Sequence, residues 1–104
     1  MDTLTPKEAH RAITEQGAGV VDVRTKAEFS EGHIANAINV DVEDFNFEER
    51  IKDLDPNKEY VVYCHSGGRS VRACSYLKSK GFKKAANMEG GISAWKKEGL
   101  PVVK

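Results

Sequence analysis

Residues 60–70 read YVVYCHSGGRS, and this stretch decides the fold class. Its first residues are apolar, β-branched or aromatic, which predicts a strand that ends at Cys64. Two glycines then allow a tight turn, after which Val71, Cys74 and Leu77 recur at helical spacing and predict one face of a helix. A buried strand that leads through a short turn into a helix is the repeating unit of an α/β fold.

The same alternation of strand and helix recurs along the rest of the chain. Two capping boxes, Thr5 with Glu8 and Thr25 with Glu28, predict the starts of two further helices. Short apolar runs predict strands at residues 20–23, 37–40 and 85–88. Helical patterns are found at residues 42–54, 71–80 and 90–98. This order implies a mostly parallel sheet with helices on both faces, which binds ligands beyond the carboxyl ends of its strands.

The composition is that of one globular domain. A chain of 104 residues is long enough for one compact domain and too short for two, so we expect residues 1–104 to form a single domain. Sixteen basic residues balance sixteen acidic ones, which argues against a nucleic-acid or membrane partner. No apolar stretch approaches the roughly 18 residues of a membrane span, and the first residues lack the pattern of a signal peptide. We therefore expect a cytoplasmic protein.

The two cysteines need separate explanations. Neither belongs to a Cys-x-x-Cys pair, and no set of cysteines and histidines has the spacing of a zinc site, so no metal is expected. A disulfide is not expected in a cytoplasmic chain. Cys74 is in phase with Val71 and Leu77 on the predicted helix, so we expect it to pack in the core. Cys64 lies instead where a strand meets a turn.

The loop after Cys64 has the composition of an anion-binding turn. Gly67 and Gly68 allow successive backbone N–H groups to point into one concavity, and the helix that follows adds its positive N-terminal end. Arg69 adds a permanent positive charge. Hydroxyl donors come from Ser66 and Ser70. A cysteine before such a loop can also be a packing residue that happens to precede a turn, but the arginine and the glycines in register favour catalysis.

A thiol beside such donors ionises more easily than a free one. Thiols at helix N-termini or near cations have pKa values of about 3.5 to 7.5, against about 8.5 for a free thiol. The same donors suit an anionic substrate and the charge on a departing group. We therefore predict Cys64 as the catalytic nucleophile. The predicted substrate-binding residues are His65, Ser66, Gly67, Gly68, Arg69 and Ser70.

His65 is not expected to act as the base for its neighbour. Adjacent residues at the end of a strand point in opposite directions, so the imidazole of His65 is poorly placed to deprotonate the Cys64 thiol. A contribution to the polarity of the loop is the favoured interpretation. His10 and His33 have no evident metal partners in the sequence.

Three ordered motifs resemble those of the single-domain rhodanese family. VVDVRTKAEFSEGHIANAINV at residues 20–40 is similar to the family's first signature, with its Asp-x-Arg, Glu-Phe and Gly-His-Ile elements. Residues 60–70 are similar to its active-site loop, and MEGGISAWKKEGLPV at residues 88–102 is similar to its C-terminal signature. One departure is Ala35-Asn36, which stands where the family often has Pro-Gly and affects loop geometry rather than chemistry.

The resemblance implies a fold and a reaction. The fold is α/β, with a central five-stranded, mostly parallel sheet and helices on both faces. The reaction is the transfer of a sulfane sulfur from a small anionic donor such as thiosulfate, or from a persulfide, to cyanide or a thiol acceptor. A Cys64 persulfide is the implied intermediate, the backbone amides of residues 65–70 cradle it, and no metal or organic cofactor is implied.

The resemblance also suggests supporting roles outside the loop. Asp22 and Arg24 match the Asp-x-Arg element, and we expect ion pairs or hydrogen bonds that hold neighbouring loops, in preference to direct contact with the substrate. Glu28 is explained by its capping box, His33 belongs to the same structural layer, and Trp95 is expected in the core.

Three other functions are compatible with the fold that the resemblance implies. Cysteine phosphatases and arsenate reductases share the rhodanese fold, but the phosphatases place five residues between the cysteine and the arginine. Four residues separate Cys64 from Arg69, and the shorter ring suits sulfur better than a tetrahedral phosphate. A non-catalytic binding module is disfavoured because such domains often lack the cysteine. A sulfur relay from a partner protein is compatible with the loop.

Overall fold

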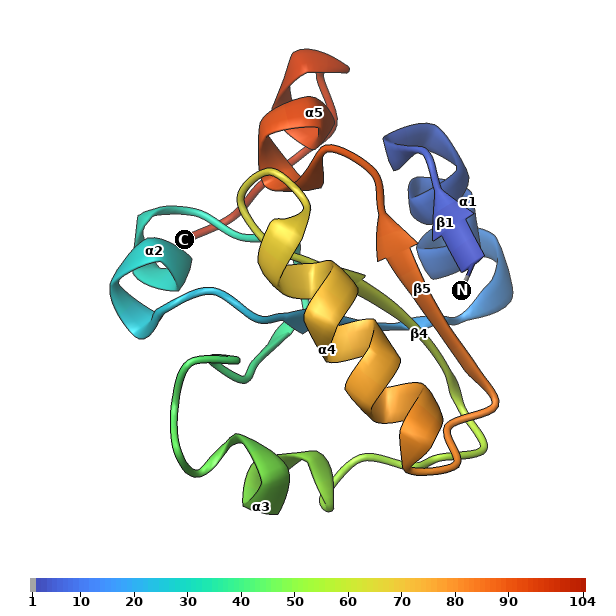
Figure 1. Cartoon of the computed structure of the whole chain (residues 1–104). Helices are drawn as coiled ribbons and strands as arrows, with labels where there is room; N and C mark the ends of the chain where they lie inside the picture. The colour runs from blue at the N-terminus through green and yellow to red at the C-terminus, as the bar shows by residue number, and fades with distance from the viewer. Residues whose placement is uncertain (1) are drawn as a thin grey trace.

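A five-stranded parallel sheet forms the centre of the molecule (Figure 1). The structure is a computed structural model and describes residues 2–104. The strands follow the spatial order β1-β5-β4-β2-β3, and all four strand pairs are parallel. Their bounds are β1 (Asp2–Leu4), β2 (Gly19–Asp22), β3 (Ile38–Asn39), β4 (Glu59–Tyr63) and β5 (Lys84–Met88). The α/β fold predicted above is confirmed.

Helices connect the strands and cover both faces of the sheet. Their bounds are α1 (Pro6–Gln16), α2 (Lys26–Glu31), α3 (Phe47–Ile51), α4 (Gly68–Ser79) and α5 (Gly91–Lys97). Alternate residues of the central strand β4 point to opposite faces. Val62 packs in a cluster with residues of α3 and α4, whereas Val61 and Tyr63 pack with residues of α1 and α5. The sheet is therefore buried on both sides, as β-branched runs in parallel strands require.

The two predicted capping boxes are both present. Thr5 accepts a hydrogen bond from the Glu8 N–H at the start of α1, and Glu8 accepts one from the Thr5 N–H. Thr25 and Glu28 do the same at the start of α2. Helix α1 ends at Gly17, whose φ of 71° lies in the left-handed region that favours glycine.

Strand β1 was not predicted from the apolar pattern. It has three residues at the edge of the sheet, and its side chains are exposed or half-buried, so it carries no apolar run. β1 is a strand because it pairs with β5, with Asp2 opposite Ala86 and Leu4 opposite Met88. An edge strand of this kind takes its structure from its neighbour rather than from its own propensity.

The prediction that Val71 faces the core was wrong. Its side chain is 40% exposed, and the buried positions of α4 are Ser70, Ala73, Cys74 and Leu77. These four have the i, i+3, i+4, i+7 spacing of one helix face, and Val71 lies next to that face. The error arose because Ser70, a polar residue, occupies the first buried position.

The helix predicted over residues 42–54 is much shorter in the structure. Only Phe47–Ile51 is helical, and Phe45, expected on the apolar stripe, is 92% exposed. Asp41 and Asp44 accept hydrogen bonds from the backbone N–H groups two residues on, which holds this segment in turns. Such aspartate turns compete with helix formation.

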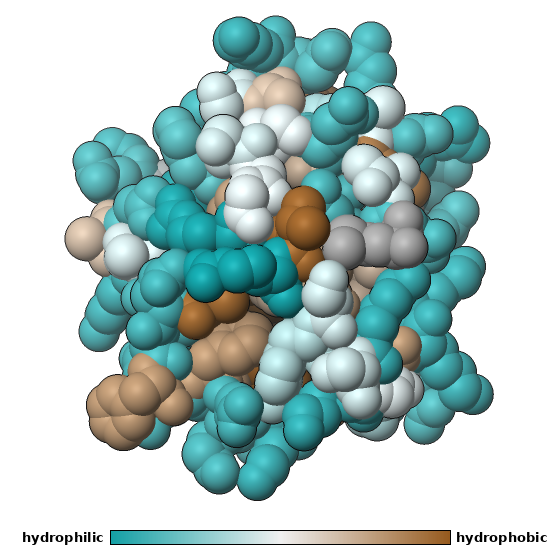
Figure 2. All heavy atoms as spheres, in the orientation of Figure 1, coloured by the Kyte–Doolittle hydropathy of each residue, from teal (hydrophilic) through white to brown (hydrophobic). Residues whose placement is uncertain are grey.

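The face of the molecule that Figure 2 shows is mainly polar. Figure 2 shows that hydrophilic residues cover most of one face of the molecule, with hydrophobic side chains in small, separate areas. No helix within residues 2–104 has the length and apolar character needed to cross a membrane.

Replacing Leu77 with alanine tests the packing of α4. Leu77 is fully buried against the sheet, so Leu77→Ala removes core contacts and leaves a cavity. We expect the free energy of unfolding to fall by about 2–5 kcal/mol. Val71→Ala, six residues earlier on the same helix, should change it by no more than about 0.5 kcal/mol. Urea unfolding followed by circular dichroism measures both, and equal losses would contradict the observed orientation of α4.

Candidate active site

Cys64 lies at the carboxyl end of the central strand β4, where the chain turns into α4. The side chain is 1% exposed, and the loop from Cys64 to Gly67 leads directly to the first turn of the helix. The carbonyl groups of Cys64 and His65 accept hydrogen bonds from the N–H groups of Ile92 and Ser93, at 2.9 and 3.2 Å. The start of α5 therefore holds the loop from the other side.

Gly91 allows this close approach of α5 to the loop. A Cβ atom at position 91 would lie 2.5 Å from the carbonyl oxygens of both Cys64 and His65. Its φ of 59° also lies in the left-handed region. A glycine is therefore required at position 91, because any side chain there would collide with the backbone of the thiol loop.

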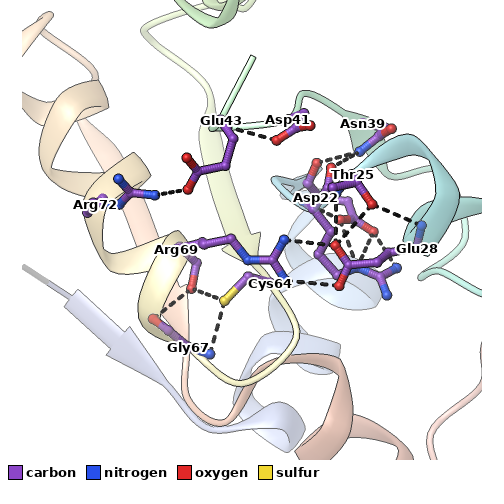
Figure 3. A network of polar contacts seen from close by, with 12 residues as sticks. Asp22, Thr25, Glu28, Asn39, Asp41, Glu43, Cys64, Gly67, Arg69 and Arg72 are labelled. Carbon is purple, nitrogen blue, oxygen red and sulfur yellow. Dashed lines mark hydrogen bonds and ion pairs between the residues drawn. The ribbon is translucent and has the colours of Figure 1, made fainter.

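Hydrogen-bond donors surround the Cys64 sulfur (Figure 3). The Gly67 N–H donates to Sγ at 3.0 Å, and the Ser70 hydroxyl lies 3.4 Å from Sγ. Burial raises the pKa of the Cys64 thiol, but hydrogen bonds outweigh it: the Ser70 hydroxyl and the backbone N–H groups of Ser70, Gly67 and Ser66 together lower the pKa below its usual value. Gly67 has a φ of 121°, a conformation that turns its N–H toward the sulfur and suits glycine.

A buried amide contacts Ser70 from the neighbouring strand, and its oxygen competes with the Cys64 sulfur for the single hydroxyl proton of Ser70. The Ser70 hydroxyl lies 2.5 Å from Oδ1 of Asn87, a buried residue of β5, and 3.2 Å from the carbonyl of Gly67. Asn87 was not predicted as a site residue. Its one signal was a polar residue inside an otherwise apolar strand, because the contact itself joins residues 17 positions apart.

Arg69 forms an ion pair with Glu28 of α2. Its two terminal nitrogens donate to the two carboxylate oxygens at 2.8 and 2.9 Å. The guanidinium of Arg69 holds the pKa of Glu28 at about 2, far below its usual value. Glu28 in turn raises the pKa of Arg69, and the negative charges of Cys64 and Asp41 add to this effect. Arg69 is therefore close enough to interact with the charged thiolate, but its direct hydrogen bonds go to Glu28.

Glu28 consequently has two roles, of which the capping box is only one. Oε1 accepts hydrogen bonds from the Thr25 N–H and hydroxyl, both at 3.1 Å, as well as from Arg69. Figure 3 shows the Arg69 side chain extending from the start of α4 toward Glu28. The ion pair therefore links α2 to the loop that follows Cys64, which the sequence pattern alone did not indicate.

Asp22 and Arg24 form the structural clasp that was predicted. Both are buried, and Nε and Nη2 of Arg24 donate to the Asp22 carboxylate, the shortest contact being 2.7 Å. Nη2 also donates to the carbonyl of Gly32 at 2.7 Å. The pair therefore ties the end of β2 to the segment after α2, away from any hydrogen bond to the thiol.

The remaining candidates have structural surroundings. His65 is exposed, in contrast to the buried Cys64. His33 stacks on Phe29 with ring centroids 3.7 Å apart. Cys74 is fully buried in the core, and burial raises the pKa of its thiol to about 12. Trp95 is buried as predicted, and its indole N–H donates to the carbonyl of Pro101 at 2.8 Å. Both cysteines are free.

No metal-binding cluster is found in the part of the chain that the structure describes. Groups of three or more His, Cys, Asp or Glu side chains able to hold a metal ion do not occur within residues 2–104. The chemistry available in the loop is that of a thiol that ionises readily and of donors that bind an anion next to it.

The amino-acid sequence and the fold of this chain are similar to those of known sulfurtransferases and rhodanese-related proteins. The chain is 38% identical over 84 residues to a protein of Allochromatium vinosum named sulfurtransferase, covering 81% of this chain and 77% of that protein. It is 36% identical over 91 residues to the thiosulfate sulfurtransferase GlpE of Pseudomonas fluorescens, covering 88% and 82%. The crystal structure of a rhodanese-related protein from Thermoplasma volcanium superimposes with a TM-score of 0.89 at 34% identity, covering 99% and 98%.

The family assignment agrees with the resemblance seen in the motifs. The sequence model of the rhodanese-like domain family matches residues 5–98 of this chain. This range includes every element from the capping box of α1 to the end of α5. The matched region contains the whole thiol loop and its partners Glu28 and Asn87. This chain therefore belongs to the rhodanese-like domain family.

Proposed function

We propose that this protein is a sulfurtransferase that carries a sulfane sulfur as a Cys64 persulfide. The observation that carries the proposal is the position of the Cys64 sulfur, buried at the carboxyl end of β4 and hydrogen-bonded by the Gly67 N–H and the Ser70 hydroxyl. Relatives that cover most of the chain are named sulfurtransferases, which supports the same reaction class.

The reaction takes place in two displacements. The Cys64 thiolate attacks the outer sulfur of thiosulfate, a new S–S bond forms, and the donor's S–S bond breaks so that sulfite leaves with the bonding electron pair. Cyanide or a thiolate then attacks the outer sulfur of the persulfide and releases the Cys64 thiolate. Covalent catalysis of this kind divides one difficult transfer into two easier steps.

The loop residues have distinct roles in this scheme. The backbone N–H groups of residues 65–70 cradle the outer sulfur and the anionic oxygens of the donor, and the Ser70 hydroxyl stabilises the Cys64 thiolate before the first step and after the second. Ser66 adds a hydroxyl at the exposed side of the loop. Gly67 and Gly68 provide the turn, His65 adds polarity at the exposed edge, and Arg69 contributes positive charge. The small anionic donor and the thiol or cyanide acceptor use the same loop in turn.

A phosphatase or arsenate reductase is the second candidate. Four residues lie between Cys64 and Arg69, and the Arg69 guanidinium is hydrogen-bonded to Glu28 through both terminal nitrogens. A ring of this size with its arginine already paired is poorly suited to a tetrahedral phosphate. A relay function, in which a partner protein delivers the sulfur, uses the same persulfide and differs only in the donor.

The persulfide can be detected directly. We expect intact-mass spectrometry after incubation with thiosulfate to show a gain of one sulfur atom, about 32 Da, that cyanide reverses. Cys64→Ser should abolish the gain. Cys74→Ser should retain it, because the Cys74 thiol is buried in the core with its pKa raised to about 12.

Two results would contradict this assignment. An unmodified wild-type mass after incubation with thiosulfate would argue against transfer from that donor. Release of phosphate from an aryl phosphate by the same preparation, lost in Cys64→Ser and without persulfide formation, would establish the phosphatase instead.

The Ser70 hydroxyl should control the reactivity of the thiol. Its hydrogen bond helps to lower the pKa of Cys64, so Ser70→Ala should raise that pKa and reduce the thiolate fraction at a pH below it. We expect alkylation of Cys64 by iodoacetamide at pH 7 to slow by about threefold to tenfold, the effect of one lost hydrogen bond. The midpoint of the alkylation rate against pH should move to higher pH.

Ser79→Ala is the matched control for this experiment. Ser79 is at the other end of α4, where its hydroxyl donates to the Tyr76 carbonyl. This variant should leave the pH profile of Cys64 alkylation unchanged. A Ser70→Ala profile that coincides with the wild type would rule out the role given to the hydroxyl.

A further inference from the structure

The only arginine of the thiol loop is already neutralised by an acid on another helix. Glu28 accepts hydrogen bonds from both terminal nitrogens of Arg69, and the pair is only partly exposed, with 26% of the Arg69 and 31% of the Glu28 side chain accessible. The Glu28 carboxylate is also fixed by Thr25, through its N–H and its hydroxyl. This carboxylate is therefore a built part of the site and not a mobile surface charge.

The charge balance near the thiol consequently differs from that suggested by the loop sequence alone. Arg69 carries one positive charge, and Glu28 and Asp41 each place one negative charge close enough to raise its pKa. The cradle around Cys64 then relies on neutral donors, the Gly67 N–H and the Ser70 hydroxyl. Neutral donors bind an anion through hydrogen bonds but compensate little of the repulsion between a dianion and nearby carboxylates.

We propose that Glu28 is a specificity-determining residue that, by pairing with Arg69, favours monoanionic sulfane-sulfur donors over dianionic thiosulfate. The monoanionic class includes thiosulfonates and the persulfides of small thiols. This inference rests on the sulfurtransferase function proposed above and defines the charge of the donor that the site prefers. Glu28 acts on the charge of Arg69 and on the field at the donor, and takes no part in bond formation.

The chemistry of the transfer is the same for each donor. With a thiosulfonate, the Cys64 thiolate attacks the outer sulfur, the S–S bond breaks, and a sulfinate leaves with the bonding electron pair. With a monoanionic persulfide RS–S⁻, the Cys64 thiolate attacks the outer sulfur, the S–S bond breaks, and RS⁻ leaves with the bonding electron pair, so that Cys64–S–S⁻ forms. No oxidant or reductant is needed in either case.

Methanethiosulfonate and thiosulfate form a matched pair of donors for the test. They transfer the same sulfur atom, and they differ in that a methyl group replaces one charged oxygen, which changes the net charge from −2 to −1. The measured quantity is the kcat/KM for thiosulfate divided by that for methanethiosulfonate, with cyanide as the acceptor. This ratio cancels general losses of enzyme activity.

Replacing Glu28 with glutamine removes the charge and keeps the shape. Glutamine retains an oxygen that can accept the Thr25 N–H, so the capping box of α2 can persist. We expect Glu28→Gln to raise the donor ratio by about threefold to fivefold, the size of one partly exposed charge interaction. The rise should come from a lower KM for thiosulfate, and it should shrink at high salt because salt screens the interaction.

Two further variants separate specificity from stability. Glu8→Gln makes the same change in the equivalent capping box of α1, where Glu8 pairs with Thr5 and not with an arginine, and it should leave the ratio unchanged. Arg69→Ala leaves Glu28 without its partner and should lower the ratio, the opposite of Glu28→Gln. A merely structural role for the pair would move both variants in the same direction or not at all.

The outcomes distinguish this inference from the proposed function. A ratio that stays constant or falls in Glu28→Gln, in an enzyme that forms the Cys64 persulfide, would overturn the role of Glu28 and leave sulfur transfer intact. Failure of the wild type to form a persulfide with either donor would overturn the proposed function, and the inference with it.

Discussion

The candidate active site depends on one requirement: a sulfur buried away from water needs hydrogen-bond donors before it can carry a negative charge. Burial by itself raises the pKa of Cys64, and the donors from Gly67, Ser66 and Ser70 reverse that effect. Cys74 shows the alternative, because it is equally buried but lacks such donors, and the pKa of its thiol rises to about 12. The difference between the two thiols comes from the turn, since only Cys64 lies where backbone N–H groups converge.

Four elements of the fold, β4, α5, β5 and α2, hold that turn in place. Strand β4 presents Cys64 at the carboxyl edge of the sheet, and the start of α5 donates to the loop carbonyls at a distance that only Gly91 permits. From β5, Asn87 contacts the Ser70 hydroxyl. From α2, Glu28 fixes Arg69 and at the same time neutralises it. A loop held this tightly is preorganised, so that little rearrangement is needed when negative charge develops on sulfur.

Local interactions account for what could be predicted from the sequence. The two capping boxes, the strand before Cys64 and the glycine turn all join residues a few positions apart, and the structure has each of them. The predictions failed where a side chain's surroundings came from elsewhere. Val71 was placed in the core because the buried Ser70 was not recognised as part of the helix face, and β1 escaped notice because its pairing partner lies more than 80 residues away.

The sequence by itself determined the fold class and the place of the thiol loop at the end of a strand, because strand periodicity, capping and glycine turns are encoded within short windows. Only the tertiary structure decided which groups complete the site. Asn87 meets Ser70 across 17 residues, and Glu28 meets Arg69 across 41, through the packing of β5 and α2 around the end of β4. The sequence showed that Arg69 brings a positive charge to the loop, and only the fold shows that the Glu28 carboxylate lies against it. Charge balance is a property of spatial neighbours, and sequence order does not reveal them.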